Sequence, residues 1–139
     1  MRVDAHATRP LRARAPLQVA GVVLAAGALV AAVDPGVPGR YPLCPFLAVT
    51  GHFCPLCGGL RAVHELTRLD VAAALSYNAL VPPTLAVAVG FWAFWLVRAR
   101  RGRSANVPAA RWIYRATLVL GVIFGVARNL PGMEALQPG

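Results

Sequence analysis

Residues 17–33 read LQVAGVVLAAGALVAAV, a run of seventeen residues without a charge. A helix needs about 17–25 apolar residues to cross a bilayer, so this run predicts a first transmembrane helix. A secretory signal peptide is the alternative, because basic residues precede the run and Val30, Ala31 and Ala32 resemble a small-residue cleavage site. Signal cores usually hold only about 7–15 apolar residues, which favours the transmembrane helix.

Two further apolar runs lie in the second half of the chain, and they predict transmembrane helices over 79–97 and 112–130. The third run contains Arg115 near its start and Arg128 near its end, and both side chains are long enough to extend to the membrane surface. An Arg-rich loop over 98–111 would join these two helices. The sequence therefore predicts an all-α integral membrane protein with three transmembrane helices.

The composition agrees with lipid contact. Of the 139 residues, 58% are hydrophobic and only 14% are charged. A water-soluble domain carries charge at roughly 25% of its positions, so this chain has too little polar surface to suit water.

The distribution of arginine predicts the topology. The net charge is +9, and most arginines lie in the N-terminal segment 1–16 and the loop 98–111. Positive residues favour the cytoplasmic side, so we expect a multi-pass plasma-membrane protein with a cytoplasmic N-terminus. The segment 34–78 and the tail 131–139 would then be extracytoplasmic. A nucleic-acid partner is not expected, because the basic segments lack a readout motif; the lipid bilayer is the expected partner.

All three cysteines, Cys44, Cys54 and Cys57, lie in the segment 34–78, which we expect to be partly helical and packed against the membrane helices. Three interpretations remain open. The thiolates could bind a metal such as zinc, with His64 or His52 as a fourth ligand. The thiols could instead do redox chemistry, with Cys54 attacking, Cys57 resolving and Cys44 as a relay. A structural disulfide is the third possibility.

Several residues near the cysteines suggest supporting roles. Arg61 and Glu65 are four residues apart on a short predicted helix and could form an ion pair. Asp70 is placed to cap the helix that follows it. Arg128 would lie on the same side of the membrane as the cysteines, where Glu65, Asp70 or an anionic ligand could pair with it.

These residues form a recognisable motif. Cys44-Pro45, Thr50-Gly51, CPLCGGLRAVH from 54 to 64, Asp70 and Asn78 occur in an order that resembles the bacterial domain of unknown function 2752 family. The resemblance covers about residues 44–81. It implies a membrane protein with no established activity and points to a set of functional or architectural positions, namely Cys44, Cys54, Pro55, Cys57, Gly58, Arg61, Asp70 and Asn78.

The chain departs from the family pattern at three positions. Leu60, Leu69 and Ala79 stand where the family usually has Thr, Gly and Pro. Without the Thr hydroxyl, a mechanism that needs a hydroxyl group beside the thiols is less favoured.

The sequence thus favours a non-enzymatic structural or interaction module whose cysteine cluster is a disulfide or zinc-type site. It could assemble with another membrane protein or with itself. An extracytoplasmic thiol-disulfide oxidoreductase is the alternative. Other classes of catalysis find no support, because the chain shows no nucleophile-base set, phosphate-binding loop or acidic pair.

Overall fold

The computed structural model describes residues 8–42, 44–103 and 108–138, with side chains described for 14–42, 44–103 and 111–138. Residues 1–7 of the predicted N-terminal segment, residues 104–107 of the predicted Arg-rich loop and Gly139 lie outside this description. All regular structure in the described ranges is helical. The prediction of an all-α chain is therefore confirmed for these residues.

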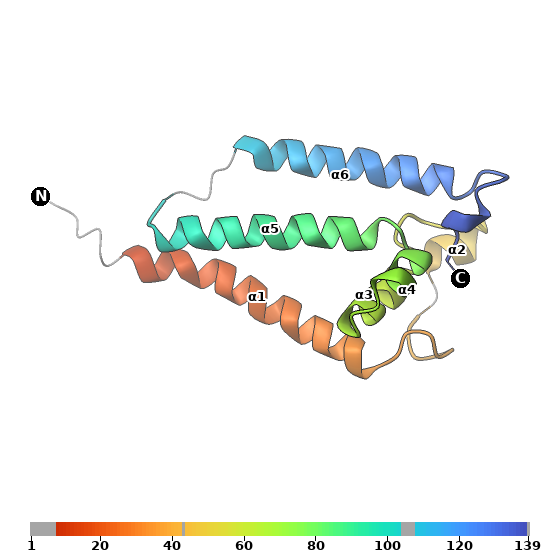
Figure 1. The fold of residues 1–139 in the computed structure, drawn as a ribbon, viewed down its shortest axis with the longest axis horizontal. Coiled ribbons are helices and arrows are strands. Elements are labelled where there is room, and N and C mark those ends of the chain that lie inside the picture. Colours follow the sequence, from red (N-terminus) through yellow and green to blue (C-terminus); the bar gives the residue numbers. More distant parts are fainter. Residues whose placement is uncertain (1–7, 43, 104–107, 139) are drawn as a thin grey trace, which may run out of the picture.

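Three long helices run lengthwise through the molecule, and the short helices gather at one end (Figure 1). The long helices are α1 (Thr8–Ala32), α5 (Val81–Arg100) and α6 (Pro108–Ala127). The short elements are α2 (Pro45–Thr50), α3 (Gly59–Thr67), α4 (Val71–Tyr77) and the 3-10 helix η1 (Glu134–Leu136). The start of α1, the end of α5 and the start of α6 lie at the opposite end from the short helices.

Two helices in the described part of the chain are long and apolar enough to cross a membrane. They comprise Arg14–Ala32 in α1 and Val81–Arg100 in α5, which correspond to the first two predicted spans. The third predicted span lies mainly on α6, which is not among these two candidate membrane-crossing helices. Its described part nevertheless exposes large apolar side chains from Trp112 to Val126.

Helix α1 packs against α5 and α3. The indole Nε1 of Trp92 on α5 donates a hydrogen bond of 2.9 Å to the carbonyl of Pro16. Near the C-terminal end of α1, Nδ1 of His64 lies 2.8 Å from the carbonyl oxygen of Val30. Because a carbonyl can only accept, this ring nitrogen carries the proton. Helix α1 is thus held at Pro16 in its interior and at Val30 near its C-terminal end by side chains from later elements.

Local signals explain where helices α4 and α5 start. Asp70 accepts a 2.8 Å hydrogen bond from the amide of Ala73, so it caps α4 as the sequence predicts. Pro82 and Pro83 occupy the first turn of α5, where a missing N–H group costs little. Leu69, at the turn between α3 and α4, has φ 63° and is the only residue other than glycine with a positive φ in the described ranges.

Helix α6 runs beside α5, but a groove of about 500 Å³ separates parts of the two helices. Its lining is apolar apart from a few hydroxyl groups, and it comprises Val81, Thr84, Leu85, Val87, Ala88, Phe91, Ile113, Tyr114 and Thr117. The C-terminal end of α6 packs against the loop that carries the cysteines, where Gly125 approaches the ring of Pro55.

Candidate metal centre

The CPLC sequence from 54 to 57 forms a tight turn just before α3. The amide of Cys57 donates a 3.0 Å hydrogen bond to the carbonyl of Cys54, which closes the turn. Gly58 follows with φ 78° and precedes the first residue of α3. A Cβ atom at this position would collide with the backbone carbonyl of Tyr77, so the site requires glycine for space as well as for backbone conformation.

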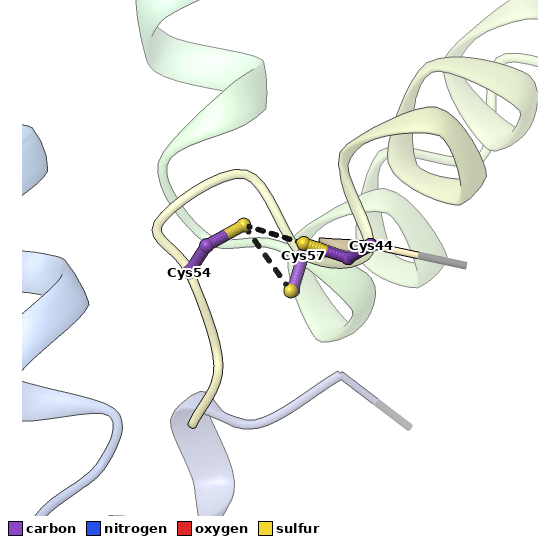
Figure 2. A group of neighbouring side chains, drawn as sticks. All are labelled: Cys44, Cys54 and Cys57. Carbon is purple, nitrogen blue, oxygen red and sulfur yellow. Dashed lines mark hydrogen bonds between the residues drawn. The ribbon is translucent and has the colours of Figure 1, made fainter. Parts of the chain in front are cut away.

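The three cysteine sulfurs meet at this turn (Figure 2). The Sγ atom of Cys54 lies 3.2 Å from that of Cys57 and 3.5 Å from that of Cys44. All three sulfurs lie within 4.8 Å of one another. Cys57 is buried, whereas Cys44 and Cys54 are half-buried. The predicted convergence of Cys44 with the CPLC turn is therefore present, and the three sulfurs are close enough to hold one metal ion.

Asn78 holds the CPLC turn from one side. Its side chain is 1% exposed, and its Nδ2 donates hydrogen bonds to the carbonyls of Pro55 at 2.9 Å and Cys57 at 3.0 Å. Its Oδ1 accepts a 3.0 Å hydrogen bond from the amide of Leu80, just before α5. This one amide group therefore links the cysteine turn to the start of a long helix.

Asn129 holds Phe53, the residue just before the CPLC turn, from the other side. Its Oδ1 accepts from the amide of Phe53 and its Nδ2 donates to the Phe53 carbonyl, both at 2.8 Å. The same Nδ2 lies 2.7 Å from the carbonyl of Gly125. A Cβ atom at Gly125 would lie only 3.1 Å from the ring of Pro55, so glycine allows α6 to approach the turn closely.

Arg128 lies between these contacts and is fully buried, with no exposed surface. Its Nη1 donates to the carbonyls of Cys54 at 2.9 Å and Cys57 at 3.1 Å. Its guanidinium carbon lies 5.0 Å from the ring centre of Phe124 and 5.7 Å from that of Phe53. The expectation that Arg128 extends to the membrane surface is therefore wrong, because the cysteine turn offers it two buried carbonyls.

The thiols have different acidities in this environment. Amide groups at the start of α2, that of Leu47 foremost, lower the pKa of Cys44 below its ordinary value, and this outweighs the opposing effect of burial. Burial, followed by the neighbouring Cys54 thiol, raises the pKa of Cys57 to about 12. In the absence of metal, Cys44 is thus a better thiolate than Cys57.

The two candidate histidine ligands lie away from the sulfurs. His64 is turned toward the end of α1, where its Nδ1 contacts Val30 and its Nε2 lies 4.0 Å from Oδ1 of Asp34. His52 is exposed, and its Nδ1 contacts the carbonyl of Thr50. Neither histidine belongs to the group of side chains that could hold a metal, which contains the three cysteines alone among the described residues. The predicted placement of His64 beside the sulfurs needs correction, because α3 presents this side chain to α1.

The remaining predicted positions make contacts that hold the fold together. Arg61 places its guanidinium carbon 5.8 Å from the ring centre of Tyr77 and so links α3 to α4. Pro55 packs on α6 at Gly125, and Asp70 is used as a helix cap. The roles of Gly125 and Asn129 were not predicted from the sequence. The one signal in the sequence for the role of Asn129 was the adjacent polar pair at 128–129, which ends an apolar run.

Comparison with known proteins found one similarity, and it covers this site. Neither the curated proteins nor the solved structures contain a match to this chain. Residues 44–92, which run from the first cysteine into the middle of α5, match the family described as Protein of unknown function (DUF2752), and this match confirms the resemblance indicated by the cysteine motif.

Proposed function

We propose that this protein is a small, non-enzymatic membrane module that binds one soft or borderline metal ion, such as zinc, through the thiolates of Cys44, Cys54 and Cys57. The observation that carries the proposal is the mutual approach of three sulfurs to within 4.8 Å. Zinc binds thiolate sulfur at about 2.3 Å, so sulfurs at two corners of a tetrahedral site are about 3.8 Å apart. The sulfur of Cys54 lies 3.2 Å from that of Cys57 and 3.5 Å from that of Cys44, which is close to this spacing.

The framework around the sulfurs supports a site that exists before metal arrives. The carbonyl groups of the CPLC turn accept hydrogen bonds from Asn78 and Arg128, and Asn129 fixes the residue before the turn. These bonds fix the backbone and so limit the positions open to Cys54 and Cys57. A preorganised site loses less conformational entropy when it binds its ligand.

The membrane arrangement is part of the same proposal. We infer three spans with the N-terminus and the α5–α6 connection in the cytoplasm, which puts the cysteine site on the extracytoplasmic side of the plasma membrane. The separation of the basic helix ends from the short helices supports this topology. The contacts of Pro16 and Val30 with later elements support an α1 that is retained as a membrane helix. The exposed apolar face of α6 suits lipid, another membrane protein or a second copy of this chain.

A cobalt titration tests the metal site. We expect the reduced, detergent-purified protein to bind one Co²⁺ per chain, with the near-ultraviolet absorption of sulfur-to-cobalt charge transfer. Cys54→Ser should weaken this absorption. His64→Ala is the matched control and should leave it unchanged, because His64 faces α1. If the fully reduced protein showed no charge-transfer absorption, the proposed function would be wrong.

Thiol-disulfide exchange is the second candidate, and the central position of Cys54 favours it. The Cys44 thiolate could attack Cys54 of a Cys54–Cys57 disulfide, which would form a Cys44–Cys54 bond and release the Cys57 thiolate. The acidity of the leaving thiol opposes this step. A pKa of about 12 makes Cys57 a poor leaving group, since exchange is faster when the leaving thiol has a low pKa. Metal binding is therefore the better-supported function.

A further inference from the structure

Arg128 is a buried cation without a carboxylate partner in the described part of the chain. It is fully buried, and its printed hydrogen bonds go to two neutral carbonyls. Its Nε and Nη2 atoms are buried and have no hydrogen-bond partner in the structure. The rings of Phe53 and Phe124 also lie near its guanidinium group. A charge in such a position is costly unless an opposite charge lies near it.

The cysteine cluster is the nearby group that can supply this opposite charge. Arg128 binds the backbone carbonyls of Cys54 and Cys57, the residues whose sulfurs form two corners of the cluster. Carbonyls and aromatic rings offer only partial negative charge to a cation. A thiolate carries a full negative charge, and a metal site needs its cysteines in that form.

The net charge of the metal-thiolate cluster depends on the charge of the metal ion, and so does its interaction with Arg128. Three thiolates around a divalent ion leave one net negative charge, and the guanidinium cancels it. Three thiolates around a monovalent ion such as Cu⁺ leave two negative charges, of which Arg128 cancels only one. The attraction between a guanidinium and a cluster grows with the negative charge of the cluster, so Arg128 stabilises a Cu⁺ cluster more than a Zn²⁺ cluster.

We propose that Arg128 is the counter-charge of the metal-thiolate cluster and that its contribution to affinity increases with the net negative charge of that cluster, so that it is larger for Cu⁺ than for Zn²⁺. This inference rests on the proposed metal site and adds a specificity-determining residue to it. Arg128 does not touch the metal; it acts through its charge and through the carbonyls of two ligand residues.

The test compares affinities for Zn²⁺ and for Cu⁺ in the full-length protein, each measured against a competing chelator. Arg128→Gln removes the charge and keeps a polar side chain, whereas Arg128→Lys keeps the charge and loses the planar guanidinium. Loss of an outer-shell partner typically lowers metal affinity about 10–100-fold. We expect Arg128→Gln to lower Zn²⁺ affinity by this factor and Cu⁺ affinity by more. Arg128→Lys should retain most of the wild-type ratio between the two ions.

Arg40→Gln is the matched control, because Arg40 is exposed and its removal changes the charge of the chain equally. It should leave both affinities unchanged. Equal losses for Zn²⁺ and Cu⁺ in Arg128→Gln, or a smaller loss for Cu⁺, would contradict the proposal, because they would indicate that Arg128 maintains the fold and does not act through its charge. If the glutamine variant does not fold, the lysine variant decides: a folded lysine variant that has lost the wild-type ratio would overturn the proposal. Absence of metal binding by the wild type would instead refute the metal site itself.

Discussion

Replacement of Asn78 by alanine should destabilise the protein strongly, because one buried side chain makes three hydrogen bonds there. Two are donated to the carbonyls of Pro55 and Cys57, and one is accepted from the amide of Leu80. Each such bond contributes about 1 kcal/mol, and a buried group left without a partner costs about 1–3 kcal/mol. We therefore expect Asn78→Ala to lower the free energy of unfolding by about 3 kcal/mol. Asn78→Asp should also destabilise, because it keeps the acceptor but loses both donated bonds.

The assay is reversible unfolding in detergent, followed by tryptophan fluorescence, with Ser76→Ala as the matched control. Ser76 is exposed and its hydroxyl bonds within its own helix, so its replacement should change the unfolding free energy by less than about 0.5 kcal/mol. An Asn78→Ala variant as stable as the control would refute the view that Asn78 holds the cysteine turn.

Three further predictions concern the turns and the thiols. Leu69→Gly should stabilise the protein by about 0.5–1 kcal/mol in the same unfolding assay, because Leu69 is exposed and has φ 63°, a conformation that costs other residues about 1–2 kcal/mol; a destabilised variant would contradict this. Gly58→Ala should prevent accumulation of folded protein in size-exclusion chromatography, since its Cβ would collide with Tyr77, and wild-type elution would disprove the close approach. In metal-free, reduced protein, iodoacetamide should label Cys44 first and Cys57 last at pH 8. The rate at Cys57 should still rise about tenfold per pH unit toward pH 11, because its pKa is about 12, and a rate that levels off below pH 10 would exclude that pKa.

The raised pKa of Cys57 also fixes a direction for stability against pH. Folding favours the neutral thiol, because the pKa of Cys57 is higher in the folded protein than its ordinary value of 9.0. This contribution is fully present below about pH 9 and is lost as the pH rises toward 12. Metal-free protein should therefore unfold more easily across that range.

Local patterns in the sequence predicted much of the fold. The charge-free run at 17–33 and the double proline before the second run correspond to α1 and α5, because length, apolar character and helix-start chemistry are local properties. The Asp70 cap was predicted for the same reason. Leu69 also shows why the family pattern has glycine at this position, since the turn requires a positive φ.

The site was only partly predictable. Close spacing indicated that the cysteines would meet, but it could not indicate which way α3 would turn His64. Arg128 and Asn129 contact residues more than 70 positions earlier, so their partners depend on how the end of α6 docks onto the CPLC turn. No local pattern encodes such a contact, and the buried position of Arg128 was therefore missed.

Native mass spectrometry of the detergent-purified protein, with metal content and free thiols measured in the same sample, tests the central claim most directly. The proposed site predicts one zinc per chain and three cysteines that alkylate after chelation. A protein without metal that contains a Cys54–Cys57 disulfide and one free thiol would contradict the claim.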